Sequence, residues 1–236
     1  MLQKTEGIVI HTIPYSDTSL IAKIFTAEFG LLAFMLRGVR GKKSSSKAVM
    51  FQPLTILDLD IYYQESKNLH TIKETRLKLN PVDIYGNVYK TSIVLFLAEV
   101  MQKLLKDNYV NAGLFAVLKD GVEELNNKEF NPDFHLYMLL NISQELGFQP
   151  LDNYSEKEPV FSLQEGKFVT DSTEHFGMYY MNRLCSHHFY LLLSNQPVLM
   201  SRTDRRDILM EILKYFQLHL PGMSAIRSVA VLQEVL

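Results

Sequence analysis

Short strand-like runs that end at turn residues fill the first eighty residues, and this pattern restricts the fold more than any other feature of the chain. β-branched and aromatic residues dominate these runs, and proline, glycine or small polar residues separate them. The pattern predicts five strands, over residues 6–13, 19–26, 31–39, 54–63 and 69–77. Five strands with short turns and one longer loop fit a small β-barrel, either of the oligonucleotide/oligosaccharide-binding (OB) type or SH3-like.

The pattern changes at Asn80-Pro81, because proline biases the residue before it away from helix. Apolar residues then recur at helical spacing as far as Lys106. Asn131 is expected to cap a third helix, with Pro132 at its first position and its end at Gly147. The other predicted helices cover residues 114–125, 177–193, 203–219 and 225–235.

Residues 148–176 interrupt the helical pattern, and the runs flanking Gln164-Glu165-Gly166 predict a small hairpin there. We therefore expect an α+β chain with two domains. A strand domain would cover residues 1–80, and an α-helical domain with an irregular hairpin region at 148–176 would cover residues 81–236.

The charge is unevenly divided between these two parts. Residues 1–80 hold 11 Lys and Arg against 7 Asp and Glu, a net +4, and the remaining residues hold 13 against 19, a net −6. Such asymmetry suggests that the first part faces nucleic acid and the second has another role.

A cationic segment between the third and fourth predicted strands is the strongest candidate site. Lysine and arginine neutralise phosphates without reading sequence, and serine and glycine can add hydrogen bonds to phosphate oxygens. OB folds also use aromatic side chains to stack bases, for which Phe34, Phe51, Tyr62 and Tyr63 are available, although at least half of such residues in a small barrel belong to its core. The candidate DNA contacts are Arg37, Arg40, Lys42, Lys43 and Lys47 of this segment, and Lys73 and Arg76 of the fifth strand.

Residues 7–63 carry a set of motifs in a fixed order and spacing. They are the turn Tyr15-Ser16-Asp17-Thr18-Ser19, the turn Thr26 to Gly30, Arg37-Gly38-Val39-Arg40 before the basic loop, and Phe51-Gln52-Pro53-Leu54-Thr55 after it. In these motifs the chain resembles the N-terminal domain of the bacterial recombination mediator family RecO. Residues 219–236, with Ile226-Arg227-Ser228, are similar to the closing helix of the same family.

The resemblance favours the OB fold over the SH3-like barrel and implies a non-enzymatic recombination mediator. Such a protein binds single- and double-stranded DNA, promotes strand annealing and helps load the strand-exchange protein onto DNA coated by single-stranded-DNA-binding protein. RecR and the acidic C-terminal tail of single-stranded-DNA-binding protein would be its partners. Arg202 and Arg206 are candidates for the cationic rim of a pocket for that tail, although solvated charges in the first turn of a helix are the favoured explanation.

Many RecO members carry a four-cysteine zinc site after a motif that matches Leu146-Gly147-Phe148-Gln149-Pro150, but the only cysteine here is Cys185. We therefore expect no zinc, and packing of Phe161, Leu163, Phe168 and Val169 would stabilise the hairpin instead. Cys185, His187 and His188 lack an acidic partner at ligand spacing, so a structural role is favoured.

Neither a phosphate-binding P-loop pattern nor a G-x-S-x-G motif occurs in the sequence, and we expect no catalytic centre and no cofactor. A single cysteine fits a reducing cytoplasm, and neither a signal peptide nor a membrane span is indicated. We expect a bacterial cytoplasmic protein that joins the nucleoid when active. An OB-fold RNA-binding factor and a protein adaptor with solubilising loop charges stay open as alternatives.

Overall fold

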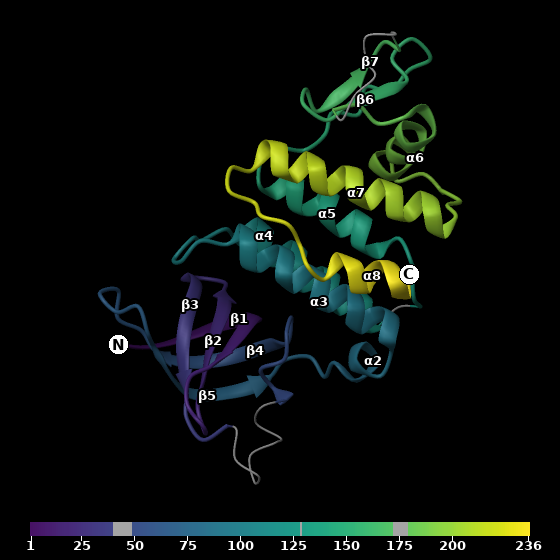
Figure 1. Cartoon of the computed structure of the whole chain (residues 1–236). Helices are drawn as coiled ribbons and strands as arrows, with labels where there is room; N and C mark the ends of the chain where they lie inside the picture. The colour runs from purple at the N-terminus through teal and green to yellow at the C-terminus, as the bar shows by residue number, and fades with distance from the viewer. Residues whose placement is uncertain (40–48, 128, 172–178) are drawn as a thin grey trace. The chain divides into compact units, whose positions relative to one another are not determined.

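The computed structural model describes residues 1–39, 49–127, 129–171 and 179–236 (Figure 1). Five strands come first, and each overlaps a predicted strand. They are β1 (Leu2–Pro14), β2 (Leu20–Thr26), β3 (Gly30–Leu36), β4 (Ile56–Tyr62) and β5 (Thr71–Leu77). The helices and the hairpin follow as α2 (Val82–Tyr85), α3 (Val88–Leu104), α4 (Ala112–Asn127), α5 (Phe134–Glu145), β6 (Val160–Ser162), β7 (Lys167–Val169), α6 (Arg183–Leu193), α7 (Arg202–His219) and α8 (Val229–Val235).

The five strands form one antiparallel sheet in the order β3-β2-β1-β4-β5. Strand β1 has 13 residues, so its first half pairs with β4 and its second half with β2. A register shift between Val9 and His11 bends the strand where it passes from one partner to the other. The two edges meet where the His70 N–H donates to Ala33 O at 2.8 Å and the Met35 N–H to His70 O at 3.0 Å. This closure makes the sheet an OB-type barrel.

Alternating apolar side chains fill the barrel. Ile24, Phe34, Leu57 and Ile61 are fully buried in one cluster, which also takes in residues on both sides of the basic segment. Asp58 is exposed and Asp60 partly exposed, because they alternate with inward-facing leucines on β4. The predicted fold class, a five-stranded OB barrel followed by helices, is confirmed.

The chain forms two compact units. One contains residues 1–130 together with 226–235, and the other contains residues 131–225. In the first unit α8 packs on α3, and the Glu99 carboxylate of α3 accepts hydrogen bonds from the Arg227 N–H at 2.9 Å and the Ser228 N–H at 2.8 Å. The last strand of the sheet ends at Leu77, and the predicted division into domains of residues 1–80 and 81–236 stays a prediction.

Several helix starts differ from the predicted ones; α8, for example, begins at Val229 and not at residue 225. Helix α5 begins at Phe134 and not near Asn131, because the Asn131 side chain accepts the Asp133 N–H at 2.9 Å and holds a turn ahead of the helix. Helix α6 begins at Arg183, where the Asn182 side chain caps it by accepting the Cys185 N–H at 2.8 Å. The hairpin predicted in the irregular region is confirmed as β6 and β7. Within the described ranges, no helix combines the length and the apolar character needed to cross a membrane.

Candidate nucleic-acid interface

The basic segment begins and ends on the barrel. Val39 is 5% exposed, and its N–H donates to Thr18 O in the β1–β2 turn at 3.0 Å. On the other side Phe51 is also 5% exposed and belongs to the barrel core. Gly38 has φ +69°, a conformation that favours glycine, and it places Arg37 on the surface just before the anchored Val39. The candidates Arg40, Lys42, Lys43 and Lys47 lie outside the described residues.

A cleft of about 360 Å³ lies next to the described residues at both ends of this segment, Val39 and Met50. Its lining combines exposed charged side chains with apolar ones, the latter being Met35, Leu36, Val39, Met50, Phe51 and Ile72. Arg37 follows β3 and Lys73 lies on β5, and both are exposed and line the same cleft. The structure therefore brings together two of the three described DNA-contact candidates of the barrel.

Arg76 lies elsewhere, although it is only three residues from Lys73. It stands opposite Asp58 in the β4–β5 ladder and lines a separate groove of about 410 Å³ with Glu6, Glu28 and Asp60. Its guanidinium donates to the Glu74 carboxylate at 2.6 Å, and this contact lowers the pKa of Glu74. Carboxylates therefore surround Arg76, an environment that repels phosphate. The predicted DNA contact of Arg76 stays a prediction.

The four candidate stacking aromatics divide into core and surface. Phe34 is fully buried and Phe51 nearly so, whereas Tyr62 is 52% exposed. Tyr63 stacks against Phe29 with ring centroids 4.4 Å apart and against the buried His70 at 5.3 Å, so its ring faces are already in use. Sequence reasoning missed Tyr15, which is 63% exposed in the β1–β2 turn. An aromatic residue inside a polar turn was the signal that could have identified it.

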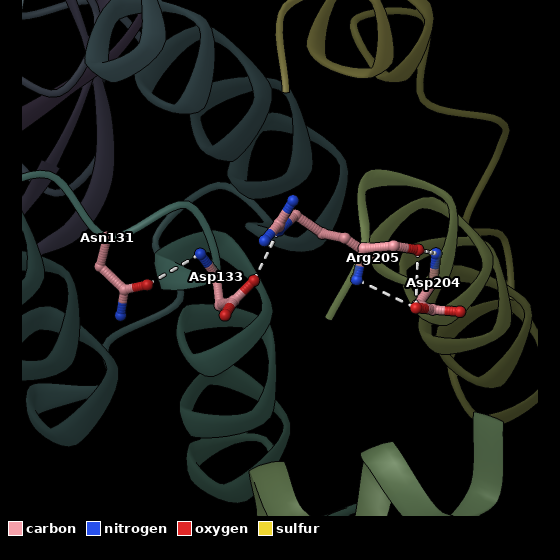
Figure 2. A network of polar contacts seen from close by, with 5 residues as sticks. Asn131, Asp133, Asp204 and Arg205 are labelled. Atoms are coloured by element: carbon pink, nitrogen blue, oxygen red, sulfur yellow. Dashed lines mark hydrogen bonds and ion pairs between the residues drawn. The ribbon is translucent and has the colours of Figure 1, made fainter. Parts of the chain in front are cut away.

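In the second compact unit, Arg205 near the start of α7 is committed to the fold. Ser201 and Asp204 form a capping box at the start of α7. Arg205 follows Asp204, and its Nε donates to Asp133 Oδ1 at 2.5 Å (Figure 2). The Arg205 side chain is only 11% exposed and that of Asp133 only 12%. This ion pair ties the first turn of α7 to the start of α5. Arg202 and Arg206 are exposed, and their predicted contact with a partner stays a prediction.

His135 lies beside this ion pair and is 1% exposed. Burial, with a smaller contribution from the positive charge of Arg205, lowers the pKa of His135 to about 3. The unfolded chain takes up a proton at this residue below about pH 6.5, whereas the folded chain does not until about pH 3. The folded state therefore loses stability as the pH falls through this window.

We expect a His135→Leu variant to show a weaker pH dependence of unfolding than the unmodified chain. Where the unfolded chain is fully protonated at this residue and the folded chain is not, the free energy of unfolding of the two proteins differs in slope by about 1.4 kcal/mol per pH unit. Urea unfolding at several pH values between 7 and 5 measures it. His187→Leu, at an exposed position on α6, provides the matched histidine substitution for comparison. Equal slopes for His135→Leu and the unmodified chain would contradict a neutral buried histidine.

Comparison with known proteins decides the family. The family model described as "Recombination protein O N terminal" matches residues 1–80, which end just after the five-stranded barrel. "DNA repair protein RecO" of Phocaeicola vulgatus is 34% identical over 241 residues, which cover 100% of this chain and 99% of the relative. The protein of the same description from Flavobacterium psychrophilum is 32% identical, with 98% of both chains covered. The chain belongs to the RecO family.

The hairpin region of this RecO-family chain lacks the four cysteines that the zinc site implied by the resemblance would need. The single cysteine, Cys185, is buried, and burial with nearby carboxylates raises the pKa of its thiol to about 12. An aromatic cluster fills the hairpin core instead. Phe161 packs against Phe168, Phe189 and Tyr215, with ring centroids 4.7 to 5.9 Å apart. Within the described ranges, no group of three or more His, Cys, Asp or Glu side chains is placed to hold a metal ion.

The hairpin is also joined by hydrogen bonds to the helices around it. The Phe161 N–H donates to Ser186 Oγ of α6 at 2.9 Å, and His219 Nε2 of α7 lies at hydrogen-bond distance, 2.9 Å, from Leu163 O. Of the four residues expected to pack here, Phe161, Leu163 and Phe168 are fully buried and Val169 is partly buried. Side-chain packing and hydrogen bonds therefore hold the hairpin region of this RecO-family chain together.

Proposed function

We propose that this chain is a non-enzymatic recombination mediator that binds single- and double-stranded DNA through its OB barrel. In this proposal it promotes annealing of complementary strands and helps load the strand-exchange protein onto DNA coated by single-stranded-DNA-binding protein. RecR and the tail of single-stranded-DNA-binding protein are the proposed partners, with Arg202 and Arg206 as candidate contacts for the tail. The proposed place of action is the bacterial cytoplasm, at the nucleoid.

One observation carries the proposal for DNA. Arg37 and Lys73, which come from different strands, line one cleft at the foot of the segment that holds Arg40, Lys42, Lys43 and Lys47. A cluster of cations on one side of an OB barrel neutralises successive phosphates and releases their counterions. Family membership supports the mediator role, because the relatives are described as DNA repair proteins.

We expect the chain to bind labelled single-stranded DNA with an affinity that falls steeply as salt rises. Arg37→Ala and Lys73→Ala should each remove one cation from the phosphates and thereby reduce the slope of log affinity against log salt by about 0.7. Fluorescence anisotropy at several salt concentrations measures both quantities. Lys157→Ala, which replaces an exposed lysine of the other compact unit, also removes one positive charge and is the matched control.

The same titrations separate the alternatives. A matched RNA that competes better than DNA would favour the RNA-binding factor. Absence of binding to either nucleic acid at low salt would refute the DNA role and leave the protein adaptor. A slope that Lys157→Ala reduces as much as Arg37→Ala would show that overall charge, and not the cleft, determines binding.

A further inference from the structure

The cleft that holds Arg37 and Lys73 is more apolar than phosphate binding requires. Leu36, Val39 and Phe51 are at most 6% exposed and form part of the rigid barrel core. Met35, Met50 and Ile72 are only half-buried, so they present apolar surface to the cleft. A surface that served phosphates alone would need cations and hydrogen-bond donors, not a hollow lined by six apolar side chains.

We propose that this cleft takes one unpaired base of single-stranded DNA, an inference that rests on the proposed DNA-binding function. Its volume of about 360 Å³ is in the range of small-ligand sites, which are mostly apolar with a few charged groups. Every base has an apolar face, so such a site accepts a base without reading its identity. The two methionines suit a sequence-tolerant site because their unbranched side chains adapt to different shapes.

The two cations at the cleft fix the orientation of the strand. Arg37 follows β3 and Lys73 lies near the start of β5, so their charges approach the cleft from two strands that meet at the barrel closure. Glu74 also lines the cleft, but Arg76 holds its carboxylate through the hydrogen bond at 2.6 Å and offsets its charge. The phosphates flanking the bound base therefore lie against Arg37 and Lys73.

This placement separates single strands from duplexes. A base inside a duplex is paired and stacked, so it reaches the cleft only after unstacking at an energetic cost. Bases on either side of the captured one keep their pairing edges free. The barrel therefore holds a single strand by one base and its phosphates while the neighbouring bases can pair with a second strand.

The test compares two labelled strands of equal length, an oligothymidylate and an abasic oligomer with the same phosphates, by anisotropy with the full chain. We expect the oligothymidylate to bind about tenfold more tightly, which corresponds to about 1.4 kcal/mol. Ile72→Ser should remove this preference while leaving the salt slope intact. Leu77→Ser is the control on the same strand, since Leu77 is 41% exposed and does not line the cleft. Thermal unfolding confirms that both variants are folded.

Each outcome is decisive. Loss of the preference in Ile72→Ser alone supports the base site. Equal, salt-dependent binding of both oligomers by the unmodified chain overturns the base site and leaves the proposed DNA binding standing. A preference that Ile72→Ser retains places base stacking elsewhere, for example on the exposed Tyr15, and also overturns it. Failure of both oligomers to bind refutes the proposed function itself.

Discussion

Replacing Gly30 by alanine is expected to lower the free energy of unfolding by roughly 2 to 4 kcal/mol, from backbone strain and overpacking together. Gly30 has φ +70°, and a Cβ atom there would lie 2.4 Å from the backbone oxygen of Tyr109. The Tyr109 backbone cannot withdraw cheaply, because the neighbouring Asn108 N–H donates to Leu31 O at 3.1 Å. An ion pair between Lys23 and Asp107 at 2.5 Å fixes the same loop to β2. The added methyl group therefore clashes with the Tyr109 backbone, which contacts to β2 and β3 hold in place.

The matched control is Gly38→Ala. Gly38 has nearly the same φ, +69°, but no atom of the residues that the structure describes lies within 4 Å of the position of its Cβ. Gly38→Ala should therefore lose only the free energy that a left-handed backbone conformation costs a residue with a Cβ atom, about 1 to 2 kcal/mol. Urea unfolding of the two variants under one condition isolates the contribution of the clash. Equal losses of stability would refute the close approach of residues 108–109 to the barrel.

Gly30 also shows where sequence reasoning reaches its limit. Strand periodicity and the turn from Thr26 to Gly30 predicted a tight reversal, and the Thr26 hydroxyl indeed donates to Gly30 O at 2.8 Å. The approach of residues 108–109 joins positions nearly eighty residues apart, and no local pattern encodes it. The same holds for α8, which returns to α3 from the end of the chain. Local signals specify elements, turns and the alternation within a strand, whereas contacts between distant segments arise only when the chain folds.

The candidate site could also be predicted only in part. Cation clustering selected Arg37 and Lys73 as candidate DNA contacts, because charge type and strand assignment can be derived from the sequence. Met50 and Ile72 were not identified, since they line the cleft only because the barrel closes through His70. Arg205 illustrates the opposite case. Arg202 and Arg206 share a helix face at i, i+4 spacing, and the sequence does not distinguish Arg205 from them. Only the position of Asp133, just before α5, shows that Arg205 points inward.

Replacing Arg205 by alanine is expected to destabilise the second compact unit by about 3 kcal/mol, because it leaves the Asp133 carboxylate buried without its counter-charge. The Asp133 side chain is only 12% exposed, and it makes no capping hydrogen bond to the α5 backbone that could compensate. Arg206→Ala is the matched control. It removes the same side chain from an exposed neighbouring position and should change stability by no more than about 0.5 kcal/mol. Urea unfolding of both variants provides the comparison.

A double variant separates the ion pair from the packing around it. Arg205→Met combined with Asp133→Leu removes both charges and keeps the apolar volume, so it should recover most of the stability that Arg205→Ala loses. Recovery in the double variant but not in Arg205→Met alone would show that the loss comes from the uncompensated carboxylate and not from the missing side-chain volume. If the double variant is instead as unstable as the sum of the two single substitutions, the two residues are not energetically coupled, and the ion pair does not join α5 to α7.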